Sequence, residues 1–374
     1  MDVLVVAGEA SGDQHAADVV AALKRKRGDV RFFGMGGPKL AAQGVELVHG
    51  AHELSVMGLV EVLPKVPRIW RVMKDLEAAA GARRPACALL VDVPDFNLRL
   101  AKKLKKLGIP VVAYVAPMVW AWREGRTKTI ARRYDRLMCI LPFEEQFLRE
   151  RGVNAVYVGN PVVDQVPPVA EASHFRRALK LDEKAPVLAV LPGSRRSEIA
   201  RILPTLVEVC RRVKAQRPNV EVVIPVAPGL PRELLSVRFE GTGLTPRFID
   251  GRAAEVVGAC DVAVVASGTA TLEAGLMRRP MVVVYRVNAI SYQVGKALVR
   301  IPFFSLINLL AGKRVVPELL QADFNVDRVL QELEPLWSGP AREACLAGLD
   351  EVRSVLGAKG AADRVADEVL AMVS

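Results

Sequence analysis

Short runs of apolar residues alternate along this chain with longer segments in which apolar residues recur every three or four positions. The short runs are typical of strands buried on both faces, and the longer segments are typical of amphipathic helices. We expect strands at 3–7, 86–91, 111–115, 137–141 and 155–158, and again at 187–191, 220–226, 261–266 and 281–285. Strands that alternate with helices predict an α/β protein with parallel sheets.

The alternation starts afresh after a segment at 161–186 that is rich in proline and charge. A chain of 374 residues exceeds what one hydrophobic core usually serves. We therefore predict two doubly wound domains, at 1–165 and 166–340, with C-terminal helices at 341–374 that pack back onto one of them, the N-terminal domain being the candidate. Because such sheets bind ligands at the carboxyl ends of their strands, a site is expected in a cleft between two facing domains.

Composition and charge narrow the class of protein. Hydrophobic residues make up 51% of the chain and charged residues 25%, as in ordinary globular proteins. The five cysteines form no C-x-x-C pair and the four histidines have no metal-site spacing, so buried thiols and no metal are expected. Neither a signal peptide nor a membrane span is expected. The net charge of +11 indicates an anionic partner, but with 5% aromatic residues and no known motif, nucleic acid is disfavoured.

A loop in the second half has the composition of a phosphate-binding turn. Ser267, Gly268 and Thr269 follow the strand at 261–266 and open a helix that carries Glu273 about one turn further on. A helix N-terminus presents backbone N–H groups to an anion, and a glutamate in its first turns can accept hydrogen bonds from a sugar diol. The alternative is an ordinary helix start capped by Ser or Thr.

A second loop of this kind lies upstream, at 191–199. Gly193 and Ser194 offer backbone amides, and Arg195 offers a forked guanidinium that suits a diphosphate. Together the two loops favour a pocket for a nucleotide diphosphate over two unrelated turns.

Carboxylates stand at two predicted strand ends in the first half. Glu9 and Ser11 lie in a glycine-containing turn at 7–13, where Ser11 or Asp13 is a candidate helix cap. Asp92 and Asp95 end the strand at 86–91, and Asp95 is the candidate general base, while Asp92 orients a neighbour or caps a turn. The alternative is a pair of solvated loop aspartates. Neither a G-x-G-x-x-G fingerprint nor a P-loop occurs in the chain.

Three further stretches combine apolar with basic or aromatic residues. A loop at 114–126 contains Trp120 and Trp122, which form either a ligand wall or core. Residues 54–76 predict a basic amphipathic helix that lies either on an anionic membrane surface or on the sheet, and the sequence leaves both open. Residues 296–310 are either core or a second apolar contact.

The segments at 8–13, 91–97, 119–123, 191–198, 266–273 and 305–312 resemble, in this order and almost from end to end, the lipid-A-disaccharide synthases. The resemblance implies a GT-B fold, in which two Rossmann-like domains face each other across a cleft, and an inverting glycosyltransferase without metal or cofactor. The family joins UDP-2,3-diacylglucosamine to 2,3-diacylglucosamine 1-phosphate, which gives a β-1,6-linked disaccharide 1-phosphate and UDP.

By this resemblance Asp95 is the general base, and Arg195, Glu273 and Asn308 belong to the nucleotide-sugar site. The family usually has a histidine at the position of Asn160 and a serine at that of Ala116. A peripheral protein on the cytoplasmic face of the inner membrane is implied, with its anionic surface as a partner and a homodimer as a further possibility. The alternatives are another GT-B enzyme that uses UDP-N-acetylglucosamine, on a lipid-linked acceptor or as an epimerase, and a non-catalytic nucleotide-sugar sensor.

Overall fold

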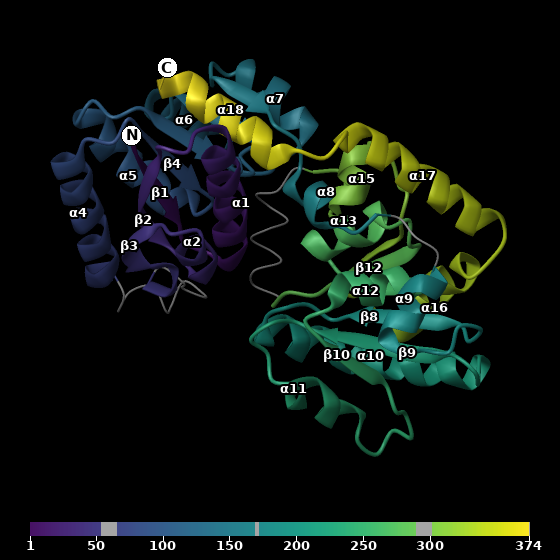
Figure 1. Ribbon diagram of the computed structural model, residues 1–374. Coiled ribbons are helices and arrows are strands. Elements are labelled where there is room, and N and C mark those ends of the chain that lie inside the picture. Colours follow the sequence, from purple (N-terminus) through teal and green to yellow (C-terminus); the bar gives the residue numbers. More distant parts are fainter. Residues whose placement is uncertain (54–65, 169–171, 289–300, 374) are drawn as a thin grey trace. The chain divides into compact units, whose positions relative to one another are not determined.

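The computed structural model describes residues 1–53, 66–168, 172–288 and 301–373 (Figure 1). The chain divides into two compact units. Unit 1 comprises Met1–Pro161 with Ala358–Ser374, and unit 2 comprises Val162–Gly357. Each unit is built around its own parallel sheet with helices between successive strands.

Unit 1 has a seven-stranded sheet in the order β3-β2-β1-β4-β5-β6-β7. Its strands are β1 (Asp2–Ala7), β2 (Arg31–Gly36), β3 (Glu46–Gly50), β4 (Cys87–Val91), β5 (Val111–Tyr114), β6 (Arg136–Cys139) and β7 (Ala155–Tyr157). The helices that connect them are α1 (Ala10–Lys26), α2 (Pro38–Ala42), α4 (Val66–Arg83), α5 (Pro94–Lys106), α6 (Thr127–Arg133) and α7 (Pro142–Arg149). The chain order reverses at β1 and β4, which makes their carboxyl ends the natural place for a ligand.

Alternate residues of the central strands enter two different cores, one on each face of the sheet. In β1, Leu4 and Val6 belong to the core that α4 and α5 cover, whereas Val3 and Val5 belong to the core that α1 covers. This is the period of two that a strand buried on both faces requires. The C-terminal helix α18 (Ala361–Val373), yellow in Figure 1, adds Val369 and its neighbours to the second core.

Helix α18 is anchored on α1 by ion pairs at its rim as well as by this packing. Asp363 accepts from Arg25 at 2.9 Å, and Asp367 accepts from Lys26 at 2.7 Å. The segment expected as one C-terminal unit, 341–374, is therefore divided, because α17 (Pro340–Leu356) belongs to unit 2 and α18 to unit 1.

Helix α4 turns its apolar stripe towards the core of unit 1. Val72, Met73 and Leu76 are 0–3% exposed and pack under the sheet, whereas Trp70 remains 54% exposed on the outer side. The apolar stripe of α4 therefore packs in the core and not on a membrane surface, which decides between the two possibilities for this part of 54–76. Residues 54–65 lie outside the described part of the chain.

Unit 2 has a six-stranded parallel sheet in the order β10-β9-β8-β11-β12-β13. Its strands are β8 (Val187–Leu191), β9 (Glu221–Val226), β10 (Arg247–Asp250), β11 (Val262–Ala266), β12 (Met281–Tyr285) and β13 (Glu318–Leu320). Its helices include α8 (Pro161–Gln165), which begins at the unit boundary, α9 (Ala172–Leu179), α10 (Arg196–Gln216), α11 (Glu233–Ser236), α12 (Ala253–Ala259), α13 (Thr269–Leu276), α15 (Leu306–Ala311) and α16 (Val326–Leu333). Four strands, β2, β3, β10 and β13, were not expected from the apolar runs.

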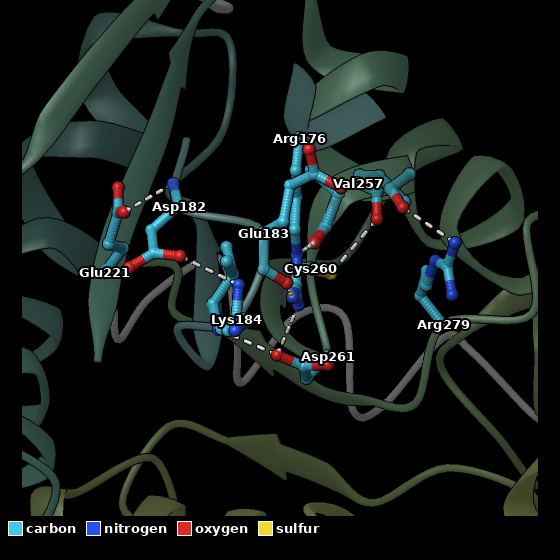
Figure 2. Close-up of polar contacts among 12 residues, drawn as sticks. Arg176, Asp182, Glu183, Lys184, Glu221, Val257, Cys260, Asp261 and Arg279 are labelled. Atoms are coloured by element: carbon cyan, nitrogen blue, oxygen red, sulfur yellow. Dashed lines mark hydrogen bonds and ion pairs between the residues drawn. The ribbon is translucent and has the colours of Figure 1, made fainter. Parts of the chain in front are cut away.

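A buried arginine ties the amino ends of β8 and β11 together, away from the carboxyl ends where a ligand would bind (Figure 2). Arg176 on α9 donates to Asp261 at 2.7 Å and to the carbonyl oxygens of Ala259 and Glu183. Asp261 in turn accepts from the backbone N–H of Val187 at 2.8 Å. A charge buried to this extent needs several partners, and these contacts supply them.

Candidate functional site

A cavity of about 330 Å³ lies in unit 2 at the carboxyl ends of β8 and β11, which are paired strands. The loop after β8 leads into α10, and the loop after β11 leads into α13, so two helix N-termini open at the same edge of the sheet. The cavity brings together seven of the residues predicted for a nucleotide-sugar site: Gly193, Ser194, Arg195, Ser267, Gly268, Thr269 and Glu273. Helix N-termini that meet at one cavity are a common feature of anion-binding pockets.

The loop after β8 folds closely around the carboxylate of Glu198. Glu198 Oε2 accepts from the backbone N–H groups of Ser194 and Arg195, each at 3.3 Å, and Oε1 accepts from Arg195 Nη1 at 2.9 Å. Gly193 has a φ of +108°, and a Cβ there would lie 2.7 Å from Glu198 Oε2. The sequence analysis did not single out Glu198, although its place three residues after the N-cap of α10 is a capping-box signal.

Glu273 lies on α13 and its carboxylate lines the cavity. Burial raises its pKa above the ordinary value. Within the described residues, no hydrogen bond or ion pair is recorded for this carboxylate, which lines the cavity. A desolvated acceptor of this kind suits a hydroxyl-bearing ligand.

Asn308 does not line this cavity, although it was expected with the nucleotide-sugar residues. Its side chain is fully buried and hydrogen-bonds with residues of the segment 315–318. The amide nitrogen donates to Glu318 at 2.7 Å and to the carbonyl oxygen of Val316, and the amide oxygen accepts from the N–H groups of Val315 and Val316. Asn308 therefore holds together the segment that leads into β13.

Asp95 stands at the start of α5, at the carboxyl end of β4 in unit 1. Its side chain is 66% exposed and pairs with Arg126, the last residue of the tryptophan-containing loop. The structure thereby joins two of the segments predicted to carry chemistry. A carboxylate that is accessible and held by one cation is positioned for contact with a substrate hydroxyl.

The backbone before Asp95 has a strained conformation. Asp92 and Val93 have positive φ values of +56° and +42°, which side-chain-bearing residues seldom adopt. The buried side-chain amide nitrogen of Asn97 donates to the carbonyl oxygen of Asp92, and Ser11 Oγ donates to Asp92 Oδ2 at 3.4 Å. Such strain is concentrated at functional sites, and here it lies beside the predicted catalytic residue.

The turn at 7–13 meets Asp92 through the start of α1. Glu9 is the N-cap residue of α1 but makes no side-chain cap, and Ser11 is exposed in the first turn. The expectation that Ser11 or Asp13 caps this helix is wrong, because Asp13 is 2% exposed and accepts from the N–H groups of Gly37, Lys39 and Leu40. Asp13 thus holds the start of α2, and Glu9 and Ser11 remain at the ligand edge.

Sequence reasoning missed Glu144, which supports the tryptophan-containing loop from beneath. Its carboxyl group is 1% exposed and accepts from Trp120 Nε1 at 3.0 Å and from the N–H of Leu141 at 3.1 Å. Burial raises its pKa to about 7. Trp120 is therefore half-buried and has a structural role in the loop. Trp122 in the same loop remains 37% exposed and stacks with Arg123.

Among the described residues, no three or more His, Cys, Asp or Glu side chains are grouped so that they could hold a metal ion. Among the same residues, no helix is both long and apolar enough to cross a membrane.

Two parallel α/β units, with a cavity at the strand ends of the second, are the architecture of the GT-B glycosyltransferases. Solved structures bear this out at the level of the fold. The calicheamicin glycosyltransferase CalG4 matches with a TM-score of 0.63 at 15% identity, covering 100% of this chain and 98% of that one. The S. aureus MnaA–UDP co-structure matches with a TM-score of 0.66 at 13% identity, covering 98% and 95%.

The particular family follows from sequence comparison. The family model described as lipid-A-disaccharide synthetase matches residues 3–348. The lipid-A-disaccharide synthase of Myxococcus xanthus strain DK1622 is 59% identical over 372 residues, which cover 99% of this chain and 97% of that protein. The chain belongs to the lipid-A-disaccharide synthase family, and it is a glycosyltransferase of lipid A biosynthesis.

Proposed function

We propose that the chain transfers the sugar of UDP-2,3-diacylglucosamine, with inversion, to the 6-hydroxyl of 2,3-diacylglucosamine 1-phosphate. The products are the β-1,6-linked disaccharide 1-phosphate and UDP. The observation that carries the proposal is the cavity at which two helix N-termini, Arg195 and Glu273 converge. Membership of the family agrees with it, as does the UDP in the MnaA co-structure of similar fold.

On the donor side, the diphosphate would lie against the loops at 193–195 and 267–269. Backbone N–H groups and the Arg195 guanidinium would stabilise the negative charge that develops on departing UDP. Glu273 would accept hydrogen bonds from the ribose hydroxyl groups. These bonds would replace the water that its carboxylate has lost through burial, and the raised pKa of Glu273 would fall as they form.

On the acceptor side, Asp95 would be the general base. As the acceptor oxygen attacks the anomeric carbon and the bond to UDP breaks, the hydroxyl proton would pass to the Asp95 carboxylate. Arg126, which contacts Asp95, would orient the carboxylate for this step. Ser11, which donates to Asp92, and Glu9, the N-cap residue of the same helix, would line the acceptor side of the site.

The test compares Asp95→Asn with Asp363→Asn, since Asp363 is also an exposed aspartate in a first helical turn that pairs with an arginine. We expect Asp95→Asn to lower turnover of the diacylated substrates by at least about a hundredfold, with UDP binding preserved, because the amide cannot accept the proton. Asp363→Asn should retain full activity. Near-normal turnover by Asp95→Asn would exclude Asp95 as the base.

The same assay separates the alternatives. Thin-layer chromatography of reactions with the diacylated donor, and with plain UDP-N-acetylglucosamine, reports whether a lipid disaccharide forms. Turnover of the plain donor alone would favour another GT-B enzyme, and UDP binding without product would favour a sensor. Glu273→Ala should weaken UDP binding more than it lowers the turnover rate of the bound substrates.

We further propose that the chain binds the anionic inner-membrane surface peripherally, through the outer side of α4. Trp70 is exposed there beside Arg71 and Lys74, and the apolar stripe of the helix is used in the core. Each well-placed cation contributes about 1 kcal/mol to binding at an anionic surface. Sedimentation with phosphatidylglycerol vesicles should decline with added salt and with Trp70→Ser, whereas an unchanged bound fraction in both cases would refute this surface.

A further inference from the structure

The donor pocket already contains an anion supplied by the protein itself. The Glu198 carboxylate accepts hydrogen bonds from Ser194 N, Arg195 N and Arg195 Nη1, and its side chain is only 13% exposed. Glu198 also lines the cavity, together with the loop that it bonds. One carboxylate thus engages three donors of the loop after β8.

These donors are the ones that a diphosphate would use. Backbone N–H groups at a helix N-terminus and a forked guanidinium are the usual ligands of phosphate oxygens. A bound diphosphate and the Glu198 carboxylate would therefore compete for the same hydrogen atoms. Their like charges would also repel at contact distance, in a pocket where screening by water is reduced.

The geometry favours a specific role over simple helix capping. A neutral side chain would satisfy the N–H groups at the start of α10, as a Gln does in many capping boxes. The additional bond from Oε1 to Arg195 Nη1 at 2.9 Å is an ion pair, and it directs the guanidinium to Glu198. Because Gly193 has no side chain, the loop can approach this carboxylate closely; an added Cβ would lie 2.7 Å from Oε2.

We propose that Glu198 is an internal counter-ion that occupies the phosphate-binding donors of loop 193–195 in the ligand-free enzyme and yields them, Arg195 first, when the diphosphate binds. This inference rests on the proposed function of the same cavity. When UDP leaves, Glu198 returns to the donors, so the loop is never left with uncompensated cationic and N–H groups. The exchange lowers the affinity for UDP and speeds the release of this product.

The test is the neutral, nearly isosteric variant Glu198→Gln. Its amide oxygen retains an acceptor for the capping N–H groups, whereas the charge that competes with phosphate is removed. The matched control is Glu208→Gln, which removes one negative charge from an exposed Glu–Arg pair on the same helix. Thermal melting of both variants establishes that they are folded.

Isothermal titration with UDP, inorganic pyrophosphate and uridine provides the readout. For Glu198→Gln we expect UDP and pyrophosphate to bind about fivefold or more tightly, with slower UDP dissociation, and uridine to bind as it does to the wild type. Glu208→Gln should match the wild type for all three ligands. A change in uridine binding of the same size would indicate general repacking and would overturn the proposal.

Two results distinguish failure of this inference from failure of the proposed function. If the wild type binds UDP, and Glu198→Gln binds it equally or more weakly, Glu198 is only a helix cap and the inference is refuted. If the wild type binds neither UDP nor pyrophosphate, the nucleotide-sugar site itself is refuted, and the inference with it. Should Glu198→Gln fail to fold, Glu198→Asp, which withdraws the carboxylate by one methylene group, should still tighten UDP binding about twofold.

Discussion

Glu144 supplies a sharp test of how unit 1 holds its tryptophan-containing loop. The carboxyl group is 1% exposed, and its ordinary pKa of 4.5 is raised by burial to about 7. Trp120 Nε1 and the N–H of Leu141 both donate to it, but they do not fully offset the loss of water. The folded chain therefore binds a proton here at pH values at which the unfolded chain has released it.

The sign and size of the effect on stability follow from this difference. Glu144 destabilises the folded state least below pH 4.5, where the carboxyl is protonated in both states. As pH rises from 4.5 towards 7, only the unfolded state loses the proton, so stability falls. Each pKa unit corresponds to about 1.4 kcal/mol, so a rise to about 7 predicts a loss on the order of 3 kcal/mol across this range.

The perturbation is Glu144→Gln, which removes the titration and keeps the shape. Urea unfolding at pH 5 and pH 7.5, followed by the fluorescence of the unit-1 tryptophans, measures the free energy of unfolding of the wild type and of the variant. We expect the wild type to lose about 2 kcal/mol more than the variant between these pH values, because part of the full change already lies below pH 5 and part lies above pH 7.5. The absolute stability of the variant is not decisive, because Gln cannot accept from both donors. Parallel pH profiles of the two proteins would refute the reasoning.

Three further outcomes follow from single contacts. Asp13→Ala should lower the free energy of unfolding by about 2–4 kcal/mol, because three N–H groups at the start of α2 lose their acceptor. A urea titration that finds no loss would contradict this. Gly193→Ala should weaken UDP binding at least about tenfold in calorimetry, because a residue with a side chain is strained at a φ of +108° and the loop's amides would shift to relieve the strain. Unchanged affinity would show that the loop keeps its shape. Val72→Ser should destabilise the chain by about 2–3 kcal/mol, whereas Trp70→Ser should leave the melting temperature nearly unchanged. Equal melting temperatures of the two variants would refute the assignment of Val72 to the core.

Much of the fold was predictable because the central strands carry their own signal. β1, β4, β8 and β11 are buried on both faces, so nearly every residue is apolar and the run is visible without any partner. The strands that were missed are less uniform. β3 and β10 are partly exposed at the sheet edges, and β2 contains Gly34 and Gly36, so their pairing partners rather than their composition make them strands.

The candidate site shows the same division. The loops at 193–195 and 267–269 were predictable because small residues between a strand and a helix are a local pattern, and β8 beside β11 then brings them to one cavity. Asn308 was expected there by resemblance, yet its amide is used within its own segment. Whether a polar side chain meets a ligand or a neighbour depends on which groups surround it, and the local sequence does not contain that information.

The sequence by itself determined the alternation of strands and helices, the two-fold repetition of this pattern and the position of the two candidate phosphate loops, because each depends on neighbours within a few positions. Tertiary structure alone decided the partners of the charged and buried groups. Arg176 meets Asp261 across 85 positions of sequence, and Trp120 meets Glu144 across 24. The pairing of a buried charge is settled by packing between distant segments, since it is there that water is excluded and the cost of an unpaired group arises.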